Sequence, residues 1–163
     1  MILRRATIQD LPFIVALEQQ LRGLNLVGAE DLATHDRRMN DPDCQYWIAG
    51  HQESQAGHVI LRGVQSVNRS IELMRIVVSE PDQGLGRAIL NALVSKVFDE
   101  LGAHRLWLDV FEHNARARHV YRSVGFVEEG VLRECVRQPG QYASLVVMSI
   151  LEDEYRARVR KIQ

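Results

Sequence analysis

The stretch Gln83-Gly84-Leu85-Gly86-Arg87-Ala88 lies between an apolar run, Leu73 to Val78, and a helical pattern that extends from Ala88 to Leu101. The apolar run predicts a strand, so the two glycines stand where a strand leads into a helix. The first four amides of a helix have no partner within it, and the helix dipole adds partial positive charge. Such a junction can hold a phosphate or a pyrophosphate without a cationic side chain. The stretch therefore predicts a nucleotide-like cofactor.

The composition bounds the class of protein. The chain has 163 residues, of which 46% are hydrophobic, which suits one compact domain over residues 1–163. Its formal net charge of −1 lacks the basic excess that nucleic-acid binding usually needs, so we expect no DNA or RNA partner. No apolar run approaches the roughly 18 residues of a membrane span. No signal peptide precedes the strand-like start, so we expect a cytoplasmic protein without membrane contact. Cys44 and Cys135 lie outside metal-ligand spacing, so we expect two buried reduced thiols and no metal.

Hydrophobic periodicity predicts both strands and helices along the chain. Strands are expected at residues 3–6, 46–49, 58–61, 70–78, 106–111, 126–136 and 142–151, with a turn at 53–57. Helices are expected after the capping-box pattern of Thr7 and Asp10, within residues 23–43, at 84–101 and 115–124, and as a frayed tail at 152–161. The order strand 70–78, helix 84–101, strand 106–111 implies that these two strands are parallel. The chain is therefore expected to form a mixed α/β fold.

Three nucleotide-binding patterns can be compared with the glycine stretch. A P-loop requires a lysine beside its last glycine, and no lysine lies near this stretch. A dinucleotide fingerprint is closer, because Gly84 and Gly86 match its first two glycines and Asp109 ends the next strand near the distance of the ribose-binding acid. Its third small position is Ile89, however, and residues 79–83 separate the strand from the first glycine where the fingerprint needs a tight turn. A dinucleotide-binding oxidoreductase therefore stays as an alternative.

The third pattern fits throughout. Gln83-x-x-Gly86-x-Ala88 resembles the acyl-CoA-binding signature of the GCN5-related N-acetyltransferase (GNAT) family. A second segment resembles the same family independently, with Asn114, Ala117, Tyr121 and then Gly125-Phe126 in the family's order and spacing. The resemblance implies a mostly antiparallel central sheet of about six to seven strands, flanked by about four helices, with a splayed parallel pair at its centre. The segment after residue 128 looks similar to the branch with ribosomal-protein and polyamine acetyltransferases.

The resemblance assigns residues to acetyl-CoA, and no metal is implied. The diphosphate would be held by the amides of the glycine loop, which comprises Gln83, Gly84, Leu85, Gly86, Arg87 and Ala88. Backbone groups of Ile76, Val77 and Val78 would pair with the pantetheine arm like an added strand, and an N–H near Ile76 or Val77 would polarise the thioester carbonyl. The Asn114 amide would bind the pantetheine region. Ala117, a small residue between Asn114 and Tyr121 on one helix face, would leave room for the arm.

Two residues are the candidates for proton transfer. By resemblance, the Tyr121 hydroxyl would donate a proton to the departing CoA thiolate, and a phenol with a pKa near 10 is protonated at neutral pH. Glu72 is the candidate base for the amine, because it shares a strand face with Met74 and Ile76 if side chains alternate. The alternative for Glu72 is a solvated acidic residue at a strand start.

The expected function is direct transfer of the acetyl group of acetyl-CoA to a primary amine, with the amine on a small molecule or at a protein N-terminus. The predicted sheet has exposed strands, so a homodimer is also expected. Besides the oxidoreductase, a non-catalytic acyl-CoA-binding module stays open, because such a module would keep the glycine loop without turning over substrate.

Overall fold

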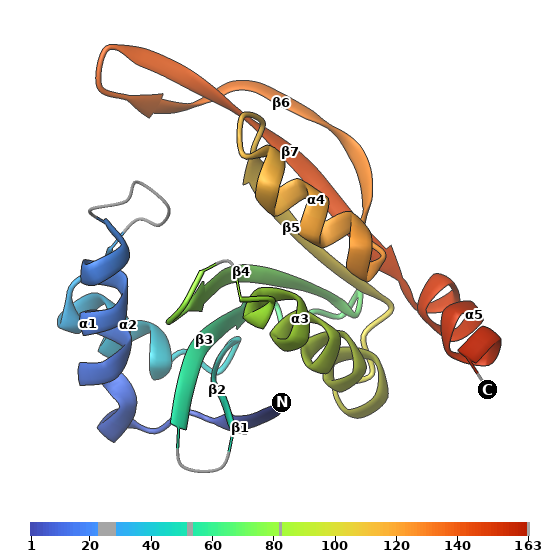
Figure 1. Cartoon of the computed structure of the whole chain (residues 1–163), viewed down its shortest axis with the longest axis horizontal. Helices are drawn as coiled ribbons and strands as arrows, with labels where there is room; N and C mark the ends of the chain where they lie inside the picture. Colours follow the sequence, from blue (N-terminus) through green and yellow to red (C-terminus); the bar gives the residue numbers. More distant parts are fainter. Residues whose placement is uncertain (23–28, 52–53, 82, 163) are drawn as a thin grey trace.

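The computed structural model describes residues 1–22, 29–51, 54–81 and 83–162, and Gly23, Gly28, Glu53 and Asp82 of the predicted loops lie outside them. The fold is a seven-stranded sheet in the order β1-β2-β3-β4-β5-β7-β6 (Figure 1). The strands are β1 (Ile2–Arg5), β2 (Cys44–His51), β3 (Ser54–Arg62), β4 (Ser70–Val78), β5 (Arg105–Phe111), β6 (Val127–Gln138) and β7 (Gln141–Leu151). Only β4 and β5 are parallel among the described strands.

This sheet confirms the mixed, mostly antiparallel architecture with a central parallel pair. It also removes the fold on which the oxidoreductase alternative depends, because a doubly wound dinucleotide domain has a mostly parallel sheet. No helix in the described part of the chain combines the length and the apolar character that crossing a membrane requires.

The helices form two layers on the sheet. The helical segments are η1 (Ile8–Asp10), α1 (Leu11–Arg22), α2 (Leu32–Met39), α3 (Leu85–Ser95), the π-helical turn η2 (Lys96–Glu100), α4 (Ala115–Val124) and α5 (Glu152–Ile162). The apolar stripe of α3, which includes Ile89 and Leu93, packs with Val59 and Leu108 in the main core. On the opposite face, Ile14 of α1 packs against residues of β2 and β3. The sheet therefore separates α1 and α2 from α3 and α4.

Several boundaries differ from those expected. The two strands of the first hairpin are longer than predicted, and the helix expected to reach Leu101 ends in the π-helical turn. Cys44 is buried, but Cys135 is exposed, so the expectation of two buried thiols is wrong for the second. The reason is that Cys135 lies on β6, the edge strand of the sheet, where β6 is mostly exposed to solvent.

The two central strands diverge after three residue pairs. The parallel register joins Ser70 to Arg105, Ile71 to Leu106 and Glu72 to Trp107, and the pairing ends there, although β4 continues to Val78 and β5 to Phe111. The splayed pair expected from the resemblance is therefore present. Beyond Glu72, the edge of β4 that faces β5 has no partner among the strands that the structure describes.

A β-bulge at Met74 changes which side chains of β4 face each layer. On β3, Ile60 pairs with Arg75 and Leu61 with Leu73, so Met74 is an extra residue. Leu73 and Ile76 both pack with the α3 core, whereas Val77 packs with α1. The expectation that Glu72 and Ile76 share a face is wrong, because the bulge interrupts the alternation between them.

A buried polar cluster joins the α1–α2 layer to β4. Glu18 on α1 is fully buried, and its carboxylate accepts hydrogen bonds from His35 Nε2 (3.2 Å), His58 Nε2 (3.1 Å) and Arg75 Nη1 (2.7 Å). The Glu30 backbone N–H donates to the same carboxylate (3.2 Å). Burial alone would raise the pKa of Glu18, but the three side-chain donors outweigh burial and lower it. These bonds hold α1, α2, β3 and β4 at one point.

The pKa of His58 is lowered below its ordinary 6.5, because burial disfavours the charged imidazole more than Glu18 favours it. The folded protein therefore keeps His58 neutral, whereas the unfolded chain takes up a proton near pH 6.5. Because the unfolded state then binds more protons, the free energy of unfolding should fall as the pH drops through that value, by up to about 1.4 kcal/mol per pH unit.

The variant His58→Gln keeps a donor for Glu18 but cannot titrate, so its free energy of unfolding should depend less on pH between about pH 7.5 and 5.5 than that of the wild type. Urea unfolding at several pH values measures this slope. His119→Gln changes an exposed histidine on α4 and should keep the wild-type slope. Equal slopes for wild type and His58→Gln would contradict the assignment.

Candidate active site

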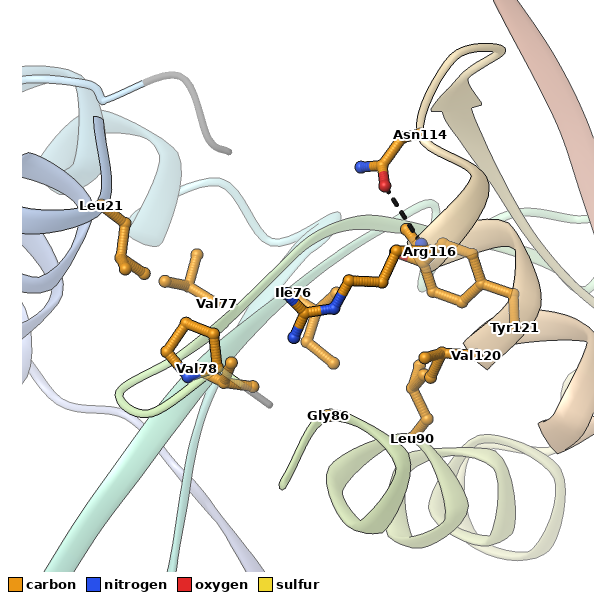
Figure 2. A pocket seen from close by; sticks show the side chains of 12 residues that line it. Leu21, Ile76, Val77, Val78, Gly86, Leu90, Asn114, Arg116, Val120 and Tyr121 are labelled. Atoms are coloured by element: carbon orange, nitrogen blue, oxygen red, sulfur yellow. Dashed lines mark hydrogen bonds between the residues drawn. The ribbon is translucent and has the colours of Figure 1, made fainter. Parts of the chain in front are cut away.

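A cleft of about 180 Å³ opens where β4 and β5 diverge (Figure 2). It lies between the second half of β4, the first half of α3 and the first two turns of α4. Its lining residues are Leu21, Ile76, Val77, Val78, Pro81, Gly86, Leu90, Asn114, Arg116, Ala117, Val120 and Tyr121. The structure thus brings both predicted sequence segments, the glycine loop and the start of α4, to one cavity.

The wall on the β4 side is the strand edge that β5 has left. Ile76, Val77 and Val78 line the cleft at this edge, beyond the last pair that joins the two strands. Backbone N–H and C=O groups need partners, and a strand edge supplies them in a row at regular spacing. This edge can therefore accept the amides of an extended ligand in the manner of an added strand.

The glycine loop forms the start of α3. Gly84 is the N-cap of α3 with φ 75°, a left-handed conformation that glycine adopts without strain, and nothing described lies within 4 Å of where its Cβ would stand. Gly86 lines the cleft, and its Cβ position is 3.9 Å from Val78 Cγ1. Gln83 and Arg87 are exposed beside it, and Leu85 and Ala88 belong to the same first turn. Gly86 therefore brings this turn to the lining of the cleft.

The start of α4 supplies the opposite wall. Asn114 is the N-cap of α4, and its Oδ1 accepts a hydrogen bond from the Ala117 backbone N–H (3.0 Å). Capping occupies Oδ1, so Nδ2 is the group of Asn114 that can donate to a ligand. Figure 2 shows Asn114 above Tyr121, with both on the α4 side of the cleft. Ala117 lines the cleft between them in sequence, and its small side chain leaves room on this wall.

Tyr121 is the one titratable phenol among the described lining residues. Burial, and to a smaller extent the negative charge of Asp109, raises the pKa of Tyr121 to about 12. Its ring packs edge-to-face on Phe126, with 5.6 Å between the ring centroids. The hydroxyl therefore stays protonated at neutral pH and is held at the cleft by a packed ring.

Glu72 is not brought to the cleft. It lies at the closed end of the divergence, paired with Trp107 across the sheet, and its carboxylate forms an ion pair with Arg62 (2.6 Å). It is absent from the residues that line the described cavity. Glu72 is therefore paired with Arg62 at the point where the two strands separate. The assignment of Glu72 as a base stays a prediction.

Sequence reasoning missed several lining residues. Leu90 and Val120 belong to helical apolar stripes that predict burial but not a cleft, and Leu21 comes from the far layer. Arg116 extends from α4 across the cleft toward Ile76 (Figure 2), and nothing in the sequence separates it from the other arginines.

In the sequence, Asp109 is notable only as the acidic residue of the dinucleotide-binding fingerprint. Partial burial raises the pKa of its carboxyl group, and Arg62 opposes that change. Because its charge also affects Tyr121, Asp109 lies within electrostatic reach of the cleft. Over the ranges that the structure describes, no three His, Cys, Asp or Glu side chains are grouped to hold a metal ion.

Comparisons with known proteins agree with this geometry. The model of the acetyltransferase (GNAT) family matches residues 14–126. Spermidine N(1)-acetyltransferase of Vibrio cholerae is 33% identical over 115 residues, which are 70% of this chain and 66% of that protein, so the alignment spans just under two thirds of the relative's length. The ribosomal protein bS18-alanine N-acetyltransferase of Escherichia coli is 40% identical over 60 residues, which are 35% of this chain and 40% of that protein.

A solved structure is similar over nearly the whole chain. The spermidine N-acetyltransferase of Vibrio cholerae in complex with CoA and spermine has a TM-score of 0.83 and 26% sequence identity, and the match covers 94% of this chain and 96% of that one. The family model covers more than half of the chain, from α1 to just beyond the end of α4. The chain therefore belongs to the acetyltransferase (GNAT) family.

Proposed function

We propose that the protein is an N-acetyltransferase that transfers the acetyl group of acetyl-CoA directly to a primary amine, on a small molecule or at a protein N-terminus. The observation that carries this proposal is the cleft at the divergence of β4 and β5, with an open strand edge on one side and the Tyr121 hydroxyl on the other. Relatives that are named for spermidine and for a ribosomal protein support an amine acceptor.

The residues of the cleft fit acetyl-CoA. The pantetheine arm would lie along Ile76, Val77 and Val78 and pair with their backbone groups. The first turn of α3, from Gln83 to Ala88, would hold the diphosphate through its amides and dipole. On the α4 side, Asn114 Nδ2 would donate to the arm, and Ala117 would leave space for it.

The acetyl group passes to the amine without an acyl-enzyme intermediate. The ammonium loses a proton to solvent, and the neutral amine nitrogen attacks the thioester carbonyl carbon, where a C–N bond forms. The negative charge on the carbonyl oxygen is stabilised by a β4 amide near Ile76 or Val77. The C–S bond then breaks, and the thiolate takes the proton of Tyr121. The nitrogen releases a second proton as the amide forms, and Tyr121 regains one from solvent. Glu72 is held by Arg62 away from the cleft, so we assign it no step.

A cytoplasmic location, a homodimer and the absence of a metal, of a nucleic-acid partner and of membrane contact stay predictions from the sequence. The non-catalytic acyl-CoA-binding module is the competing proposal, because it would use the same cleft and the same loop. Only the acetyltransferase needs the Tyr121 hydroxyl, so a change at Tyr121 distinguishes the enzyme from the binding module.

Tyr121→Phe removes the proton donor and keeps the ring. We expect kcat to fall by about 100-fold, which is typical of losing a general acid, and the affinity for acetyl-CoA to stay within about 2-fold because the cleft keeps its shape. Release of free thiol measures the rate, and calorimetry measures the affinity. Tyr155→Phe removes a hydroxyl that binds Asp99 on η2, away from the cleft, and should keep the wild-type rate. A wild-type rate for Tyr121→Phe would remove its role as the acid.

Gly86→Val should weaken acetyl-CoA binding by at least about 10-fold, because its Cβ position is 3.9 Å from Val78 Cγ1 and a larger side chain would fill the cleft. Titration with acetyl-CoA measures the effect, and NAD(H) should not bind to either protein. Ala157→Val adds bulk on the exposed side of α5 and should bind acetyl-CoA normally. Unchanged affinity in Gly86→Val would place the cofactor elsewhere.

A further inference from the structure

One face of β5 carries two aromatic side chains with a carboxylate between them. Leu106, Leu108 and Val110 are buried in the core with α3 and α4. Because side chains alternate along a strand, Trp107, Asp109 and Phe111 point to the opposite face. Asp109 is exposed there, and the two aromatic residues are partly exposed.

The neighbouring strands continue this face. Across β7, Asp109 pairs with Val147 and Phe111 with Leu145, and across β6, Val147 pairs with Gly130. Directly opposite residues share a face of the sheet. The row through Asp109 therefore ends in a glycine, and nothing described lies within 4 Å of where a Cβ at Gly130 would stand. The row of Asp109, Val147 and Gly130 therefore has smaller side chains than the neighbouring rows that contain Trp107 and Phe111.

This face adjoins the reaction site through the gap in the sheet. Trp107 is the last residue of β5 that pairs with β4, so Asp109 lies two residues beyond, on the diverging part of the strand. Tyr121 reaches the same gap from the α4 side, and the charge of Asp109 contributes to its raised pKa. An acceptor on the Asp109 face would approach the thioester from the side opposite α3 and α4.

Three carboxylates on this side of β3 and β4 have arginine partners. Glu72 pairs with Arg62, and Glu18 and Glu30 both pair with Arg75. Asp109 has no hydrogen bond to any residue that the structure describes, and Arg62 acts on it only through space. Over the described residues of β3, β4 and β5, Asp109 is therefore the one carboxylate without a bound partner.

We propose that Asp109, between Trp107 and Phe111, binds the ammonium group of the acceptor, and that the acceptor is a monoamine with an apolar body. This inference rests on the proposed acetyl transfer. An ammonium gains from a carboxylate and from adjacent aromatic rings, and the apolar body would lie against Val147 and Leu145. The further charges of a polyamine would find no second unpaired carboxylate among the described residues of β3, β4 and β5 and would approach Arg62 and Arg75.

The test compares molecules of similar length and increasing charge: hexanol, hexylamine, 1,6-diaminohexane and spermidine. Calorimetry measures their binding to the protein in the presence of CoA, and thiol release from acetyl-CoA measures transfer. We expect hexylamine to bind at least about 10-fold more tightly than hexanol and to have a higher kcat/KM than spermidine. Asp109→Asn should weaken hexylamine binding by at least about 10-fold without changing the affinity for acetyl-CoA.

Asp153→Asn makes the same change at an exposed position of α5 and should leave both measurements unchanged. Trp107→Leu provides a second variant, and it should weaken hexylamine binding even if Asp109→Asn proves unstable. Wild-type affinity in Asp109→Asn, or a higher kcat/KM for spermidine than for hexylamine, would overturn the inference. If hexylamine binds through Asp109 but no thiol is released, the binding site stands and the proposed acetyl transfer fails. If transfer occurs and neither variant changes hexylamine binding, the proposed acetyl transfer stands and the Asp109 binding site fails.

Discussion

The separation of β4 from β5 after Glu72 and Trp107 is the constraint on which the site depends. Up to that pair the two strands satisfy each other's backbone groups, and beyond it the facing edge of β4 has no partner among the described strands. Unpaired backbone groups at the centre of a sheet are costly unless water or a ligand satisfies them. The open edge is therefore both a weakness of the fold and the surface on which an extended ligand can bind.

Both layers of helices fix the geometry of this gap. On one side, α3 and α4 pack on the common core and present the glycine turn and Tyr121 to the cleft. On the other side, Glu18 binds Arg75, which stands directly after the bulge at Met74. Burying a carboxylate is expensive, and well-packed apolar residues often stabilise a core as well as a buried ion pair does. We interpret the hydrogen bonds of Glu18 with His35, His58 and Arg75 as contacts that fix the position of β4 relative to α1 and α2.

The parts of the site that depend on local spacing could be predicted from the sequence. Gly84, Gly86, Asn114 and Tyr121 take their places from the first two turns of α3 and α4, and helical geometry relates residues a few positions apart. The position of Glu72 relative to Ile76 could not be predicted, because the bulge at Met74 arises from the register with β3. The place of Asp109 beside the gap could not be predicted either, because it depends on the divergence of two strands that are distant in sequence.

The gap also couples the two faces electrostatically. The negative charge of Asp109 is one of the causes that raise the pKa of Tyr121, because a nearby anion disfavours ionisation of the phenol. Once the amine has attacked the thioester, its nitrogen carries a positive charge until the second proton leaves, and beside Asp109 this charge would offset that contribution. The pKa of Tyr121 would then be lowered while the C–S bond breaks, which is when the departing thiolate needs its proton. Occupation of one face of the sheet would in this way adjust the chemistry available on the other.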